Sequence, residues 1–257
     1  MQPMINMALR TAREGSEKAL LASARLDRLK IVSNDPFDFS SNMDHEINEL
    51  VVSNLRKAYP KHTIKSRIGE PIMGQDTEPS WYIDPLFGSL NFAKGNPSYG
   101  VSIAIEIEGN IEHSILTLPE YNQEFIASKG SGAQLNKTKL RVNPKGKFEN
   151  SLLGVCLGQK NIESSIKLVT LLARENPQIR MSGCSTFDML MVCKNSLGAS
   201  FCEASEDFSV RAAILVLKES GALISSELGD PSLGAASEFY FGAPRIFKEL
   251  VKLRKLV

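Results

Sequence analysis

The chain has 257 residues, of which 42% are hydrophobic and 23% charged, and its formal net charge is +1. A chain near this length buries roughly three quarters of its unfolded surface, so a full hydrophobic core is expected. The balanced charge excludes a global attraction to nucleic acid or to anionic membranes, so partner binding must come from local patches.

Neither a signal peptide nor a membrane span is predicted. Residues Met1 to Arg10 lack an apolar core, and the apolar run Ala212 to Leu217 is far too short to cross a bilayer. We therefore expect a cytoplasmic protein. The four cysteines form no Cys-x-x-Cys pair and have no neighbouring histidine, so a zinc site is not expected.

The first half of the chain shows an α+β pattern. Apolar residues at helical spacing predict helices over residues 4–24 and 43–58, the second terminated by Pro60. Strands are predicted over residues 82–84, 100–108, 111–118 and 124–128, with a hairpin turn at 108–110. This predicts an N-terminal lobe, residues 1–145, with an antiparallel sheet.

The second half alternates between strands and helices. Strands are predicted over residues 152–157, 199–203 and 222–226, and helices over 162–175, 187–194 and 210–220. Gly221 fits the residue that ends the last of these helices. The pattern predicts a second, α/β lobe, residues 146–257. It ends in a basic amphipathic helix over 245–257, whose polar face is either solvated or a docking surface for RNA or an acidic protein.

One run, from Trp81 to Phe92, combines an apolar strand with Asp84-Pro85 and then Gly88-Ser89. An Asp after a strand, followed by a helix start, supplies the parts of a phosphate site. The run resembles the Asp-Pro-(Ile/Leu)-Asp-Gly-(Thr/Ser) signature of the inositol monophosphatase family, in which both aspartates bind magnesium. Asp84 matches the first aspartate, whereas Phe87 stands in place of the second.

The resemblance extends over nearly the whole chain and is to the bacterial SuhB branch of that family. Segments that carry it include Arg56 to Pro60, Lys129-Gly130, Leu135-Asn136 and Gly221-Ala222. It implies a layered αβαβα sandwich of two tightly packed lobes, and a homodimer. It also implies a role in ribosomal RNA transcription antitermination, through contacts with NusA and RNA polymerase.

Most magnesium ligands of the resembled family are replaced here. The Glu-Glu pair that precedes the signature falls on Arg67 and Ile68, and Glu70 could substitute only if the loop slides. The late Asp falls on Ser209, with Asp207 two residues too early. No octahedral set of oxygens remains, so no cofactor is expected, and Mg²⁺ only if the site is rebuilt. We predict instead that a guanidinium, from Arg67 or Arg211, lies within salt-bridge reach of Asp84.

Other family positions are retained. By resemblance, Asp44 and Ser89 match the pair that orients the attacking water, Gly88 and Ser89 the phosphate-binding turn, and Gly183 and Glu203 the substrate contacts. Each has a structural alternative: Gly88-Ser89 as a strand-to-helix turn with a cap, Asp44 as a first-turn helix charge, and Asp84 as an Asx cap.

Three functions stay open from the sequence. The first is a catalytically impaired SuhB-like protein that acts through protein contacts. The second is a Mg²⁺-dependent inositol-1-phosphate or other sugar-phosphate phosphatase with a rebuilt site. The third is a sensor of a phosphorylated small molecule, bound at the retained phosphate turn without chemistry.

Overall fold

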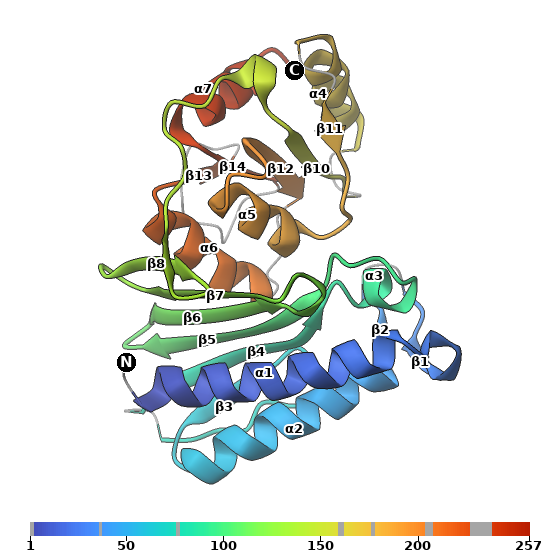
Figure 1. Cartoon of the computed structure of the whole chain (residues 1–257), viewed down its shortest axis with the longest axis vertical. Coiled ribbons are helices and arrows are strands. Elements are labelled where there is room, and N and C mark those ends of the chain that lie inside the picture. Colours follow the sequence, from blue (N-terminus) through green and yellow to red (C-terminus); the bar gives the residue numbers. More distant parts are fainter. Residues whose placement is uncertain are drawn as a thin grey trace.

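The computed structural model describes residues 3–35, 38–75, 78–158, 162–175, 178–203, 208–226 and 238–257 (Figure 1). Its elements form α, β, α, β and α layers in that order. Helices α1 (Pro3–Ser23) and α2 (Asn42–Ala58) cover one face of a seven-stranded sheet. Helices α5 (Ser185–Cys193) and α6 (Phe208–Ser220) lie between this sheet and a five-stranded sheet, and α4 (Ile162–Glu175) and α7 (Pro244–Arg254) lie outside the latter. The layered αβαβα sandwich is thus confirmed.

The seven-stranded sheet has the strand order β3-β4-β5-β6-β7-β8-β9, with β3 and β4 parallel and every other pair antiparallel. The predicted hairpin turn between β5 and β6 forms with Glu108 and Gly109 at positive φ. The strands are β3 (Thr63–Ser66), β4 (Ser80–Phe87), β5 (Gly100–Ile107), β6 (Asn110–Leu118), β7 (Gln123–Ser128), β8 (Gly132–Leu135) and β9 (Thr138–Leu140).

The five-stranded sheet has the order β11-β10-β12-β14-β13. Strand β10 is parallel to β11 and β12, whereas β14 is antiparallel to both of its neighbours. The sequence patterns did not predict β3, β8, β9, β11 or β14. The strands are β10 (Leu153–Cys156), β11 (Ile179–Arg180), β12 (Ala199–Glu203), β13 (Leu223–Ser226) and β14 (Glu238–Gly242).

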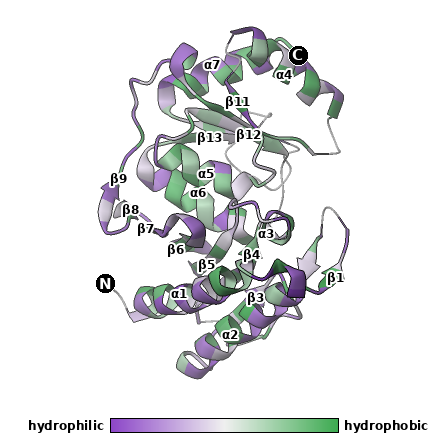
Figure 2. Ribbon diagram, turned by 45° about the vertical axis from the view of Figure 1, so that its right-hand side comes forward, coloured by the Kyte–Doolittle hydropathy of each residue, from purple (hydrophilic) through white to green (hydrophobic). Residues whose placement is uncertain are grey.

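Buried side chains form two clusters, one on each face of the seven-stranded sheet. The first cluster joins α1 and α2 to alternate residues of β5, such as Ile103 and Ile105, as expected from the side-chain period of a strand. The second surrounds the apolar helices α5 and α6 (Figure 2). It joins Phe125 of one sheet to Phe201 and Phe241 of the other, so a single core spans both predicted lobes. The boundary between residues 145 and 146 stays a prediction.

Short elements complete the chain. Strands β1 (Ile31–Ser33) and β2 (Ser40–Ser41) pair with each other, and α3 (Ser89–Ala93) follows β4. Three short 3-10 helices are η1 (Leu26–Arg28), η2 (Pro119–Tyr121) and η3 (Phe148–Asn150). Among the described residues, no helix combines the length and apolarity needed to cross a bilayer.

Candidate functional site

Asp84 lies within β4 and not at its end, so the predicted strand boundary was wrong. The strand continues to Phe87, and its pairing with β5 shifts between Asp84 and Phe87. At this irregularity the Asp84 Oδ1 atom accepts the backbone N–H of Leu86 at 3.3 Å. The contact is the Asx-type cap that the structural alternative predicted.

The turn after β4 requires glycine. Gly88 has a φ of +72°, and a Cβ atom there would lie 2.4 Å from the carbonyl oxygen of Ser98. Any other residue would be both strained and overlapping at this position. Ser89 then begins α3, and its hydroxyl donates to the Leu86 carbonyl at 2.6 Å. The turn therefore has a structural reason that is independent of a phosphate.

Asp44 lies in the first turn of α2 and forms a capping box with Ser41. Its Oδ2 atom accepts the backbone N–H and the hydroxyl of Ser41, each at 2.8 Å. The reciprocal contact, from the Met43 N–H to the Ser41 hydroxyl, is 3.3 Å long. The spacing Ser41-x-x-Asp44 is a capping signal readable in the sequence, and it was missed. The other carboxylate oxygen, Oδ1, faces the site and accepts the Ser89 hydroxyl.

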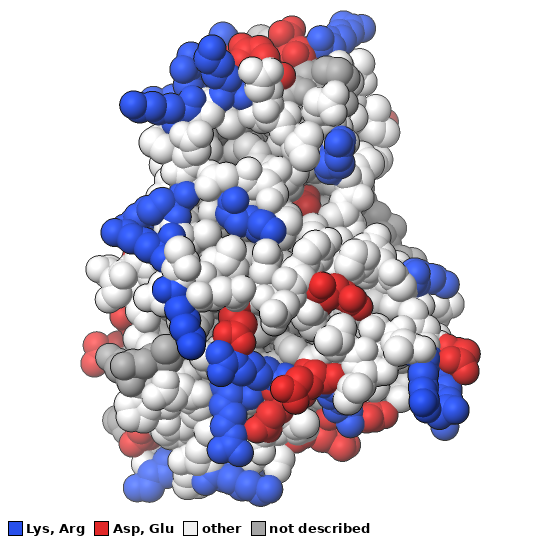
Figure 3. Space-filling view, viewed as in Figure 1, with Lys and Arg blue, Asp and Glu red and all other residues white. Residues whose placement is uncertain are grey.

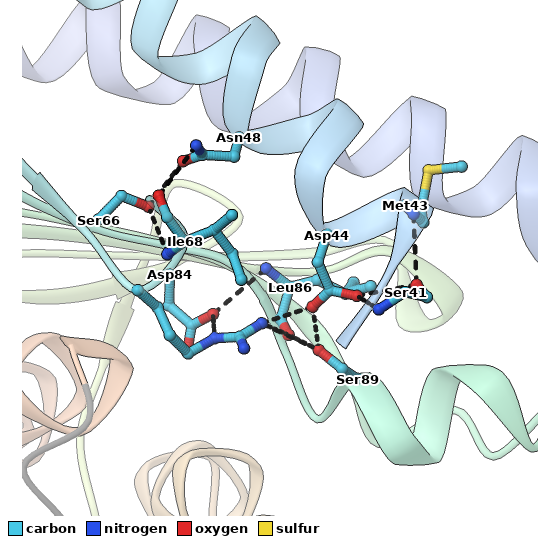
Figure 4. Close-up of polar contacts among 10 residues, drawn as sticks. Ser41, Met43, Asp44, Asn48, Ser66, Ile68, Asp84, Leu86 and Ser89 are labelled. Atoms are coloured by element: carbon cyan, nitrogen blue, oxygen red, sulfur yellow. Dashed lines mark hydrogen bonds and ion pairs between the residues drawn. The ribbon is translucent and has the colours of Figure 1, made fainter. Parts of the chain in front are cut away.

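Arg67 joins these elements, because it bonds to Asp44, Asp84 and Ser89, whose side chains lie close together in Figure 4. Its Nε atom lies 3.0 Å from Asp84 Oδ1, and its Nη2 atom lies 2.5 Å from Asp44 Oδ1. The Nη2 atom also donates to Ser89 Oγ at 3.0 Å and to the Leu86 carbonyl at 3.2 Å. The predicted guanidinium within salt-bridge reach of Asp84 is therefore confirmed, and Arg67 supplies it.

The ion pairs of Arg67 are buried. The exposed fractions of the side chains are 16% for Arg67, 0% for Asp44 and 3% for Asp84. Burial works to lower the pKa of the Arg67 guanidinium, but the nearby charges of Asp84 and Asp44 outweigh it and raise that pKa. The arginine is therefore a permanent positive charge held between two carboxylates.

The backbone around Arg67 is fixed independently of its side chain. The Arg67 N–H donates to the Ile83 carbonyl at 2.9 Å. On either side of Arg67, the Ser66 hydroxyl donates to the side chain of Asn48 at 2.7 Å, and the Asn48 side chain donates to the Ile68 carbonyl at 3.1 Å (Figure 4). Helix α2 thus holds the start of the loop that carries the arginine.

Arg211, the other candidate for this contact, lies elsewhere. It is exposed on α6, and its guanidinium carbon lies 5.5 Å from the centre of the Tyr82 ring, a cation–π arrangement. Nothing in the sequence distinguished its position from that of Arg67.

The replaced metal positions are filled by other contacts. Phe87 is buried against Gly100, and Ser209 is buried with its hydroxyl 2.9 Å from that of Thr186. Glu70 is exposed and does not line the pocket at Asp84, so it does not replace the lost carboxylates. Asp207 and the side chain of Glu203 lie outside the described residues.

The donor set does not fit magnesium. An octahedral Mg²⁺ site needs several converging oxygens, and here the two nearest carboxylates are bonded to a guanidinium. Within the described parts of the chain, no group of three or more His, Cys, Asp or Glu side chains is arranged to hold a metal ion.

A pocket of about 230 Å³ adjoins Arg67 and Asp84. Its wall includes the predicted residues Gly88, Ser89 and Gly183, and Asn91 of α3 donates to the Ser182 carbonyl at 2.9 Å, which holds the two walls together. The charged residues that line its described part are Asp38, Arg67 and Asp84. With two carboxylates against one guanidinium, the described lining is not basic.

A buried carboxyl group lies on α5, beyond the pocket wall. Burial raises the pKa of Asp188 to about 6, although hydrogen bonds from Ser182, Ser200 and Cys156 work to lower it. The Ser200 hydroxyl lies 3.3 Å from the carboxylate, and the Cys156 thiol 3.8 Å from it. The same burial raises the pKa of the Cys156 thiol well above its usual value, so this thiol is a poor nucleophile.

Comparisons with known proteins agree with this fold. The model of the inositol monophosphatase family matches residues 1–254. The chain is 32% identical to the Nus factor SuhB of Pseudomonas aeruginosa, over 98% of this chain and 95% of that protein. It is 28% identical to the Nus factor SuhB of Escherichia coli, with the same coverage.

Solved structures show the same fold. The extragenic suppressor protein suhB of Bartonella henselae superimposes with a TM-score of 0.93 at 23% identity, over 99% of both chains. The inositol monophosphatase of Thermotoga maritima superimposes with a TM-score of 0.87 at 20% identity, over 99% of this chain and 98% of that one. The chain therefore belongs to the inositol monophosphatase family.

Proposed function

We propose that this protein is a catalytically impaired, SuhB-like member of the family that acts in ribosomal RNA transcription antitermination, through contacts with NusA and RNA polymerase. The observation that carries the first part is the position of Arg67. Its guanidinium bonds to both Asp44 and Asp84, the carboxylates at retained family positions whose side chains the structure describes.

The chemistry of a metal-dependent phosphatase opposes this arrangement. A divalent ion on Asp84 would lie next to a positive charge. It would also have to displace a guanidinium that makes four hydrogen bonds, one of them to Asp84 itself. The pair matched to water orientation, Asp44 and Ser89, is also engaged by Arg67. The described residues therefore offer neither a set of oxygens that fits a divalent ion nor an unengaged carboxylate to orient water.

The relatives support the second part of the proposal. The similar proteins of P. aeruginosa and E. coli are named Nus factors, and the likeness extends over 98% of the chain. A function that depends on a folded surface does not need the metal carboxylates, so it tolerates their replacement. The homodimer that the resemblance implies belongs to this proposal, and light scattering of the purified protein tests it.

Calorimetry with NusA from the same organism tests the proposal. We expect binding by the wild-type protein and unchanged affinity for Asp84→Asn, which removes the carboxylate charge but keeps an acceptor for Arg67. No binding in either calorimetry or a pull-down assay would overturn the antitermination role. A large loss of affinity in Asp84→Asn, with the fold intact by circular dichroism, would tie the contact to the pocket instead.

The sensor function remains the second candidate, because a pocket with the turn Gly88-Ser89 and the backbone of Gly183 persists. Titration of the metal-free protein with inositol-1-phosphate tests it, and saturable binding would favour it. The phosphatase alternative has less support, since Glu70, the candidate replacement ligand that the structure describes, does not line the pocket.

A further inference from the structure

A strip of positive charge runs along one edge of the molecule, on the side opposite α3 (Figures 1 and 3). Figure 3 shows Lys and Arg side chains gathered over α7 at the upper left and again further down the same edge. The members of this basic strip are all exposed, and they are Lys137, Lys139, Arg141, Lys145, Lys147, Arg245 and Lys248.

The fold itself aligns these side chains. In β9 and the residues that follow it, Leu140 and Val142 are buried in the core. Lys139 and Arg141 alternate with them and are exposed, as the alternation of an extended chain requires. In such a chain, alternate residues lie roughly 6 to 7 Å apart. Lys139 and Arg141 are therefore neighbouring cations on the outer face of this segment.

The residues that follow Val142 in the chain pack against α7. Gly146 lies so close to Ile246 that a Cβ atom on the glycine would be 2.9 Å from the isoleucine Cδ1 atom. This contact sets Lys145 and Lys147, on either side of the glycine, next to the first turn of α7. Arg245 occupies that turn, so the extended segment and the helix form one continuous surface.

The strip is not neutralised by the part of the chain that the structure describes. None of its members makes an ion pair there. The carboxylate of the neighbouring Glu219 accepts the backbone N–H groups of Gly130 and Gly132, at 2.8 and 2.7 Å. Glu249 of α7 faces Lys252 at 3.6 Å. On a chain with a net charge of only +1, this is a local concentration of charge.

A polar groove of about 330 Å³ adjoins the strip. Lys147 lines it together with the amides of Asn143, Asn150 and Asn195 and the hydroxyl of Ser196. The Asn195 carboxamide is used within the fold, because it accepts the Asn143 N–H at 2.5 Å and donates to the Arg141 carbonyl at 2.9 Å. The exposed side chains of Asn150 and Ser196 offer donors and acceptors for a base edge or a ribose.

We propose that the basic strip binds single-stranded RNA, with phosphates along the cations and a nucleotide in the adjoining groove. A cluster of exposed cations without ion pairs among the described residues fits the charged backbone of a nucleic acid, and a hydrogen-bonding groove beside it fits a nucleotide. This binding goes beyond the NusA contact proposed above and does not depend on it.

The test is fluorescence anisotropy with a labelled single strand of RNA of about 20 nucleotides, at salt concentrations from about 50 to 200 mM. The strip variant is Lys139→Glu, Lys145→Glu and Lys248→Glu combined. The matched control, Arg56→Glu, Lys57→Glu and Lys61→Glu combined, makes the same change in net charge at the far end of α2 (Figure 1).

We expect the strip variant to bind RNA at least about 10-fold more weakly than wild type, and the control to stay within about 3-fold. A plot of the logarithm of the association constant against the logarithm of the salt concentration should have a slope shallower by about 2 in the strip variant. The variant removes three cations, and each lost phosphate contact on a single strand reduces the slope by roughly 0.7.

Three results would overturn the proposal. The first is the absence of RNA binding by the wild-type protein at the lowest salt concentration. The second is an equal loss of RNA affinity in the strip variant and the control variant. The third is displacement of the labelled RNA by polyglutamate at a lower concentration of charge than by unlabelled RNA. The last would assign the strip to an acidic protein.

Discussion

Replacing Arg67 by methionine removes the cation that joins α2, β4 and the turn before α3. Methionine keeps most of the aliphatic volume, so the change isolates the charge and its hydrogen bonds. It leaves Asp44 and Asp84, with side chains 0% and 3% exposed, as two buried carboxylates without their cation. Removing one partner of a buried ion pair typically destabilises a protein by about 3 to 5 kcal/mol.

We therefore expect the free energy of unfolding to fall by about 3 to 5 kcal/mol at pH 7, and the melting temperature by roughly 10 °C for a chain of this size. Urea unfolding and thermal unfolding at pH 7, each followed by circular dichroism, measure the two changes.

Two further variants make the experiment specific. Arg56→Met, an exposed arginine of α2 without an ion pair among the described residues, should change stability by less than about 0.5 kcal/mol. Adding Asp84→Asn to Arg67→Met should recover part of the loss, since it removes one of the two unpaired charges. If Arg67→Met were as stable as Arg56→Met, the guanidinium would not hold the site together.

Three other predictions concern the metals and a buried acid. The wild-type protein should not hydrolyse inositol-1-phosphate at millimolar Mg²⁺, and EDTA should not shift its melting temperature; magnesium-dependent turnover that Asp84→Asn abolishes would contradict this. Combining Arg67→Glu, Phe87→Asp and Ser209→Asp restores the carboxylates of the family and should create Mg²⁺ binding measurable by calorimetry; no binding would mean that the loops differ as well. The pKa of Asp188 is raised to about 6 in the folded protein, against about 3.9 in an unfolded chain, so stability should decline by about 2 to 3 kcal/mol as the pH rises from about 4 to above 6. Asp188→Asn should remove that decline, which urea unfolding at pH values on both sides of this range measures. Equal pH dependence of stability in the wild type and in Asp188→Asn would contradict the raised pKa of Asp188.

The sequence predicted the long periodic elements well. Helices α1 and α2 lie within a few residues of their expected bounds, because an apolar stripe at helical spacing has one stable way to be buried. Strand β14 was missed because all five of its residues are buried on a strand whose pattern does not alternate. Strands β8 and β9 are short and half-exposed, so their pattern carries little signal.

The sequence predicted which metal ligands are replaced, but it did not predict which contacts take their place. Charge alone indicated that a cation must approach Asp84, but it could not choose between Arg67 and Arg211, because that choice depends on how a loop and a helix face each other. The sequence also could not indicate that the Leu86 carbonyl accepts from Arg67, because every residue has a backbone carbonyl. Only the Ser41 cap left a sequence signal that could have been used.

The most direct test of the central claim is a crystal structure of the protein grown with magnesium in excess. We expect the Arg67 guanidinium between Asp44 and Asp84, with no ion on either carboxylate. An ordered divalent ion on Asp84, with Arg67 turned to solvent, would contradict the account and restore the metal-dependent phosphatase.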